Sequence, residues 1–131
     1  MPVFSLRSYQ QLDTCDLRLQ KVLLEVIKHY DFTVIEGYRS REAQEVAFAA
    51  GKSQVHWDKS THCTYPSQAV DVAPYPINWS DLTRFHFLGG FIMGIACRMG
   101  VKLRWGGDWD GDLNIKEHSL HDPGHFELRE V

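Results

Sequence analysis

The chain has 131 residues, of which 44% are hydrophobic and 24% charged, and its formal net charge is −3. This length and apolar content suffice for one small core, so we expect residues 1–131 to form a single domain. The slight acidity, with no run of Lys or Arg, argues against a nucleic-acid-binding protein that follows phosphates through a basic patch.

The amino terminus lacks the charged start, apolar run and cleavage site of a secretory signal. The longest apolar stretch, residues 85–99, is interrupted by His86 and Arg98 and is too short to span a bilayer. We therefore expect synthesis in the cytoplasm and no transmembrane segment.

The first predicted helix carries apolar residues at spacings of three and four between residues 19 and 30, with Asp13 or Thr14 as its cap. A strand is expected next, at residues 32–36, and Gly37 ends it. This helix should pack on the sheet to which that strand belongs.

A second helix is predicted to begin after Ser40 as its cap and to end near Gly51. Residues 69–73 then read as a short buried strand bounded by Pro74. His62 precedes this strand and is placed on a loop that leads into it.

The longest helix should open at Ser80 or Asp81 and stop at Gly100. Its expected buried face comprises Phe85, Leu88, Ile92, Ile95 and Met99. Cys97 is interpreted as a small core residue. Three interior glycines each cost up to about 1 kcal/mol relative to Ala, so we expect close packing to compensate at Gly89, Gly90 and Gly94.

Two further strands are predicted at residues 101–105 and 125–128. The element order is therefore helix, strand, helix, strand, helix, strand, strand. This order predicts the α+β class, with a small, mainly antiparallel sheet backed by helices.

Two histidines and two aspartates stand in clusters that suit a metal: His62 with Asp71, and Asp122 with His125. A hydrolytic zinc site usually has three nitrogen or oxygen ligands from the protein and leaves one position for water. His62, Asp71 and His125 would supply the three ligands, which leaves Asp122 free to act as a base. Chance proximity of seven histidines and seventeen acidic residues is the alternative.

Three phrases of the chain, at residues 59–74, 105–110 and 122–128, resemble in this order the M15 zinc peptidases. The resemblance extends from Phe32 to Leu128 and is greatest to the L-alanyl-D-glutamate endopeptidases that phages use as endolysins. It implies a fold like that of the hedgehog domain and the D-Ala-D-Ala peptidases. The stretch between His62 and Asp71 is longer than in the family pattern, so this loop should take its own path.

The resemblance implies a bound Zn²⁺ ion, with Asp122 as general base and acid. It also implies that Arg39, after the Gly-Tyr turn, holds substrate or the developing oxyanion, because a guanidinium can grip a carboxylate through two hydrogen bonds. A surface arginine paired with Glu42 is the alternative. Ser60 is expected to contact substrate, with a plain loop serine as the alternative.

The expected substrate is the stem peptide of bacterial peptidoglycan, cut by a monomeric enzyme after its release to the wall of an infected host. Two alternatives stay open. One is a D-Ala-D-Ala carboxypeptidase or dipeptidase of the same family, and the other is a zinc-binding module without catalytic activity.

The remaining candidates are weaker. Cys15, Cys63 and Cys97 are too few and too widely spaced for a disulfide framework, and Cys63 should point away from a metal held by His62. The alternating aspartates Asp108, Asp110 and Asp112 could bind calcium, although their spacing fails the EF-hand pattern. Trp105 and Trp109 are interpreted as the wall of a cleft or as core residues, and the other five histidines as surface or partly buried residues.

Overall fold

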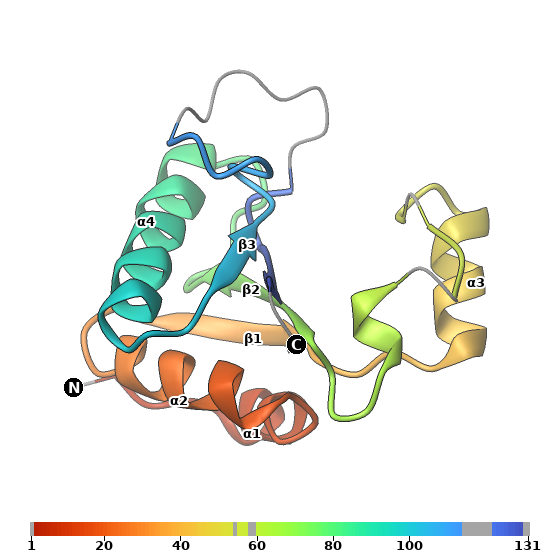
Figure 1. Cartoon of the computed structure of the whole chain (residues 1–131), viewed down its shortest axis with the longest axis horizontal. Helices are drawn as coiled ribbons and strands as arrows, with labels where there is room; N and C mark the ends of the chain where they lie inside the picture. The colour runs from red at the N-terminus through yellow and green to blue at the C-terminus, as the bar shows by residue number, and fades with distance from the viewer. Residues whose placement is uncertain (1, 54, 58–59, 114–121, 130–131) are drawn as a thin grey trace.

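The computed structural model describes residues 2–53, 55–57, 60–113 and 122–129 (Figure 1). Within these ranges the helices are α1 (Leu6–Leu12), α2 (Leu17–Val26), α3 (Arg41–Ala49), the 3₁₀ helix η2 (Thr61–Cys63) and α4 (Leu82–Arg98). The strands are β1 (Phe32–Glu36), β2 (Ala69–Pro74), β3 (Leu103–Trp105) and β4 (His125–Leu128).

The four strands form one sheet in the order β1-β2-β4-β3, and every neighbouring pair is antiparallel. The helices α2 and α4 pack against each other and, with α1 beside β1, cover one face of this sheet (Figure 1). The predicted α+β class, with an antiparallel sheet backed by helices, is confirmed.

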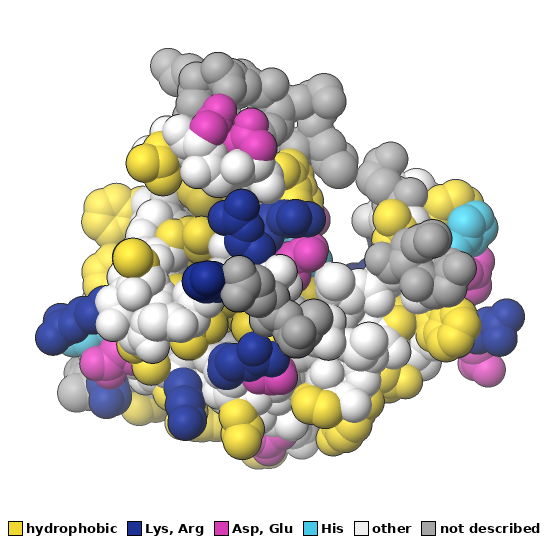
Figure 2. Space-filling model, viewed as in Figure 1, with side chains coloured by type: hydrophobic (Ala, Val, Ile, Leu, Met, Phe, Trp, Pro, Cys, Tyr) yellow, Lys and Arg dark blue, Asp and Glu magenta, His cyan; other side chains and the backbone are white. Residues whose placement is uncertain are grey.

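The helix α3 lies apart from the other helices, on the far side of η2 (Figure 1). Figure 2 shows a notch in the molecular surface between the part that carries α3 and the rest of the molecule.

Successive residues of a strand point to opposite faces of a sheet, and here the two faces differ in chemistry. The core face is formed by apolar side chains that pack against the helices: Val34, Val70, Val72, Leu103, Trp105, Phe126 and Leu128. The opposite face carries Asp71, His125 and Glu127, and we call it the site face.

A β-bulge in β1 changes which residue faces Asp71. Val34 pairs with Val72, but the register then shifts, and Glu36 rather than Ile35 becomes the partner of Asp71. A bulge re-aims side chains in this way by adding one unpaired residue to a strand. The acidic side chain of Glu36 is thereby placed on the site face.

The amino-terminal helices differ from the prediction in two respects. The helix α1 was not predicted, because Leu12 is its only buried apolar residue and its buried side also includes Ser8, whose hydroxyl accepts a hydrogen bond from Val34 N. The cap of α2 is Asp16, not Asp13 or Thr14, and its carboxylate accepts from Arg18 N. For α3 the predicted cap, Ser40, is confirmed.

The cap of α4 is Asp81, as one of the two predicted alternatives, and Gly100 follows its end with a φ of +74°. Two predicted core residues are wrong: Met99 is 42% exposed and Cys97 is exposed, because the helix turns Ala96 toward the core instead. Among the described residues, neither this helix nor any other is long and apolar enough to cross a membrane.

Close packing at the glycines of α4 is confirmed for only one of them. A Cβ on Gly89 would lie 2.1 Å from the Trp105 ring, so the helix approaches β3 closely there. At Gly90 and Gly94 an added Cβ would meet nothing within 4 Å, and the expectation was wrong for both.

Candidate metal centre

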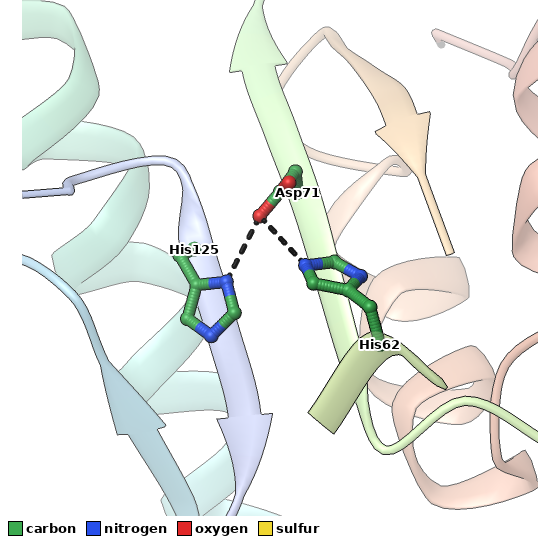
Figure 3. A group of neighbouring side chains, drawn as sticks. All are labelled: His62, Asp71 and His125. Carbon is green, nitrogen blue, oxygen red and sulfur yellow. Dashed lines mark hydrogen bonds and ion pairs between the residues drawn. The ribbon is translucent and has the colours of Figure 1, made fainter. Parts of the chain in front are cut away.

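Asp71 lies between His62 and His125 in a compact group of side chains (Figure 3). Asp71 on β2 is the register partner of His125 at the start of β4, whereas His62 comes from η2. One potential ligand atom from each of the three residues lies within 4.8 Å of the others. The fold thus brings together the three residues that the sequence predicted as metal ligands.

The His62 ring points Nδ1 toward the backbone of Gly37 and Nε2 toward Asp71. Its Nδ1 lies 2.7 Å from the carbonyl oxygen of Gly37, which can only accept, so Nδ1 carries the hydrogen. A Cβ at Gly37 would lie 2.4 Å from Thr14 Oγ1, so this carbonyl depends on glycine. The buried Nε2 is 3.3 Å from Asp71 Oδ1 and has no hydrogen-bond partner in the described part of the chain.

His125 lies between two carboxylates. Its Nδ1 is 3.0 Å from Asp71 Oδ1, and its Nε2 is 2.8 Å from Glu127 Oε1. Burial lowers the pKa of this imidazole, but the hydrogen bonds to Asp71 and Glu127 outweigh it and raise the pKa to about 10. Without a cation at the site, His125 therefore carries the positive charge that balances these carboxylates.

The carboxylate of Asp71 stays ionised at the centre of the group. Burial alone would raise its pKa, but the hydrogen bond from His125 and the interaction with His62 hold the pKa well below its usual range. The guanidinium of Arg39 lies a further 3.5 Å from Asp71 Oδ2. A metal ion could take the place of the cationic donors that surround this carboxylate.

The donor set fits a zinc ion. Two imidazole nitrogens and one carboxylate oxygen are ligand types that zinc accepts, and three protein ligands are typical of its hydrolytic sites. Within the described residues the buried Nε2 of His62 makes no hydrogen bond, and this is the direct structural sign of the fit, because buried polar atoms normally make one. The group is therefore a possible metal-binding site.

Asp122 lies three residues before His125, the first residue of β4, and is solvent-exposed. Its backbone oxygen accepts from His125 N at 3.1 Å, and its own N–H donates to Gly106 O at 3.0 Å, which fixes its backbone beside His125. Partial desolvation by surrounding protein raises the pKa of its carboxyl, and the negative charge of Asp71 adds to the rise. Asp122 thus lies within the electrostatic reach of the metal group without belonging to it.

Arg39 does not pair with Glu42, the partner considered from sequence. Its Nε and one terminal nitrogen bond Glu36, the other terminal nitrogen donates to Gln44 Oε1 at 2.8 Å, and Asp71 is the further contact. The side chain is only 14% exposed. Arg39 is therefore fixed against a metal-ligand candidate by partners that the sequence did not reveal.

Gln44, like Glu36, is a residue beside the site that sequence reasoning missed. Its side chain is fully buried and, besides accepting from Arg39, it donates to Ser53 Oγ and Val55 O, each at 2.7 Å. It joins α3 to the segment that leads toward η2. The signal in the sequence was a single polar residue on the buried side of an otherwise mixed helix, which is too weak to select it.

Ser60 and Cys63 flank His62 on η2. The hydroxyl of Ser60 caps η2 by accepting from His62 N at 3.3 Å, which orients the histidine, and a contact with substrate stays a prediction. Cys63 Sγ lies 3.9 Å from Gln44 Oε1 and is absent from the metal group among the described residues. This placement agrees with the expectation that Cys63 points elsewhere.

Of the five other histidines, His29 and His56 are exposed and His86 is partly buried, as expected. His118 and His121 lie outside the described residues. The two tryptophans have different surroundings. Trp105 is a core residue stacked on Phe126, whereas the ring of Trp109 lies 5.5 Å from that of His125.

The aspartates at 108, 110 and 112 also offer oxygens within 4.8 Å of one another. Asp108 Oδ2 accepts from Leu113 N and Asp110 Oδ1 accepts from Asp112 N, so bonds within the loop account for part of this arrangement. Calcium binding at this loop stays an open prediction.

Comparison with known proteins identifies the family. The profile of the phage L-alanyl-D-glutamate peptidases matches residues 2–129. The L-alanyl-D-glutamate peptidase of Escherichia phage T5 is 34% identical over 134 residues, covering 95% of this chain and 96% of that protein. The crystal structure of the L-Ala D-Glu endopeptidase ChiX of Serratia marcescens gives a TM-score of 0.77 at 26% identity, covering 96% of this chain and 90% of ChiX. The chain thus belongs to the family of phage L-alanyl-D-glutamate peptidases.

Proposed function

We propose that this protein is a zinc-dependent endopeptidase that hydrolyses the L-alanyl-D-glutamate bond in the stem peptides of bacterial peptidoglycan. The observation that carries the proposal is the convergence of His62 Nε2, Asp71 Oδ1 and His125 Nδ1 in a member of this family. We propose that residues 1–131 act as one monomeric domain on the cell wall of an infected host, after synthesis in the cytoplasm.

In this proposal His62, Asp71 and His125 hold the ion. When bound, Zn²⁺ acts as a Lewis acid that polarises the scissile carbonyl and makes water more acidic at neutral pH. Two neutral imidazoles and one carboxylate leave such an ion with net positive charge. Binding would displace the proton from His125 Nδ1, because that nitrogen must offer its lone pair.

Asp122 would move the proton. Its carboxylate would accept a proton from the attacking water and deliver it to the nitrogen of the leaving amine. The raised pKa of Asp122 supports this role, because a stronger base accepts a proton more readily and still returns it. Its position next to β4, fixed through the backbone of His125 and Gly106, would keep the carboxyl beside the reacting carbonyl.

Arg39 and Ser60 would act on the substrate side. Stem peptides carry carboxylates, and the Arg39 guanidinium lies 3.5 Å from Asp71 Oδ2. We propose that it stabilises a substrate carboxylate or the developing oxyanion, with Glu36 and Gln44 holding its plane. Ser60 would add a polar contact at the edge of η2.

Two measurements test the proposal. Elemental analysis should find one zinc per chain in the wild type and a loss of zinc when His62, Asp71 or His125 is changed to Ala, because two remaining ligands hold the ion weakly. Purified sacculi digested with the wild type should gain free amino groups on D-glutamate. Full zinc occupancy in His125→Ala would contradict the ligand set, and release of D-alanine would contradict the scissile bond.

A further inference from the structure

Glu127 is in direct contact with His125, a proposed metal ligand, on the side of the ring away from Asp71. Its Oε1 lies 2.8 Å from His125 Nε2, and its side chain is 16% exposed. The distance is that of a charge-assisted hydrogen bond. On the opposite side of the imidazole, Asp71 Oδ1 lies 3.0 Å from Nδ1, and the centre of the His62 ring lies 5.2 Å from that of His125.

The strand geometry explains why these two side chains meet. His125 and Glu127 are two positions apart on β4, so they lie on the same face, while Phe126 and Leu128 between and after them enter the core. Arg104 on β3 is the register partner of Glu127 and places a cation on the site face. Glu127 is therefore held in the sheet rather than on a mobile surface segment.

The bond determines which nitrogen of His125 is available. An ionised carboxylate can only accept, so Glu127 holds a hydrogen on Nε2. A metal ion would then bind the other nitrogen, Nδ1, in place of the hydrogen that faces Asp71. The carbonyl of Gly37 has the corresponding effect on His62, where it takes the hydrogen on Nδ1 and leaves Nε2 bare. The two histidines thus present different nitrogens to one point, each oriented by an outer acceptor.

We propose that Glu127 is a positioning residue that keeps the hydrogen of His125 on Nε2 and so makes Nδ1 the atom that binds the metal. This inference rests on the zinc site of the proposed function. It assigns Glu127 neither to the metal nor to proton transfer with substrate. Such outer carboxylates fix the orientation of a ligand imidazole and increase its basicity, and their loss typically weakens metal binding about 10- to 100-fold.

The first test measures zinc dissociation constants by competition with a chelator. Glu127→Ala should bind zinc about 10- to 100-fold more weakly than the wild type, whereas Glu127→Gln should lose less, because an amide oxygen still accepts from Nε2. Glu45→Ala is the matched control: Glu45 pairs with His56 Nδ1 at 3.0 Å on an exposed surface, and its zinc affinity should equal that of the wild type. Far-UV circular dichroism of the metal-free variants checks that each keeps the fold.

The second test reads the imidazole directly. Nitrogen NMR of the zinc-loaded wild type should show the metal on His125 Nδ1 and a hydrogen on Nε2, a pattern that a merely structural Glu127 would not dictate. Zinc on Nε2, or a Glu127→Ala affinity equal to that of the wild type, would overturn the inference and leave the zinc site intact. A wild type that binds no zinc would overturn the proposed function and this inference together.

Discussion

On β4, Phe126 and Leu128 pack into the core, whereas His125 and Glu127, which alternate with them, lie on the site face. The core face is made of interchangeable apolar groups, and its contribution is area removed from water. The site face is made of paired polar groups whose partners come from other strands and from η2. Changes on the core face should therefore alter stability at constant activity per folded molecule, and changes around the site face should do the reverse.

The largest effect on activity is expected for Asp122→Ala. Loss of a general acid and base costs about 10²- to 10⁴-fold in rate, while the three metal ligands remain, so zinc content and melting temperature should stay close to wild type. Muropeptide release and metal content are to be measured on the same preparation. Near-normal turnover would move the base to another residue.

Arg39→Lys should already impair the enzyme, because an ammonium cannot reproduce the planar guanidinium that bonds Glu36 and Gln44. The expected loss in transition-state stabilisation is about 2 to 4 kcal/mol, by analogy with removal of an oxyanion donor. The measurement is kcat/KM on a soluble stem peptide.

The matched control for Arg39 is Arg41→Ala. Arg41 lies over the Trp57 ring at 4.9 Å, and its removal should change kcat/KM little. Equal rates for the wild type, Arg39→Lys and Arg39→Ala would remove Arg39 from the site.

On the core side, Gly89→Ala should destabilise the fold by about 1 to 3 kcal/mol, because its Cβ would overlap the Trp105 ring that fills the space under α4. Gly90→Ala, one residue on, adds its methyl group to open space and should stabilise the helix by up to about 1 kcal/mol. Denaturant unfolding compares the two. A stable Gly89→Ala protein would show that helix and sheet are less closely packed than described.

The smallest effect concerns the cap of α2. Asp16→Ala should cost about 0.5 to 2 kcal/mol at pH 7, because the carboxylate accepts the Arg18 N–H at the helix start. Hydrogen bonds from the Arg18 side chain hold the pKa of the Asp16 carboxyl below its usual range. A depressed folded pKa gives stability that is present above the unfolded pKa and disappears as the pH falls through the folded value.

The difference between wild type and Asp16→Ala should therefore shrink in acid below about pH 4. Asp13→Ala is the control, since Asp13 is exposed and ends α1, and it should stay within about 0.5 kcal/mol of wild type. A larger loss for Asp13 than for Asp16 would restore the cap that the sequence first suggested.

Much of the core face could be predicted from sequence, because apolar periodicity is local. It identified the strands at 32–36 and 125–128 and the helices capped by Ser40 and Asp81. It failed for α1, whose buried side includes a serine, and for Met99, which follows the end of α4. In both cases tertiary contacts decide burial, and the sequence pattern does not contain them.

The candidate site was only partly predictable. Spacing and family resemblance pointed to His62, Asp71 and His125, which the fold brings together. Glu36 reaches this group through a bulge, and no sequence pattern announces that bulge. The alternation of His125 with Glu127 was visible in the sequence, but its meaning depends on which face of β4 lies toward Asp71.

Cleavage of a soluble stem peptide by metal-depleted and zinc-restored protein tests the central claim most directly, with products identified by mass spectrometry. Zinc-restored wild type should yield a fragment that begins with D-glutamate, metal-depleted protein should yield none, and zinc-restored His62→Ala should remain inactive at the same zinc concentration. Equal cleavage by the metal-depleted protein, or a product cut at another bond, would contradict a zinc-dependent L-alanyl-D-glutamate endopeptidase.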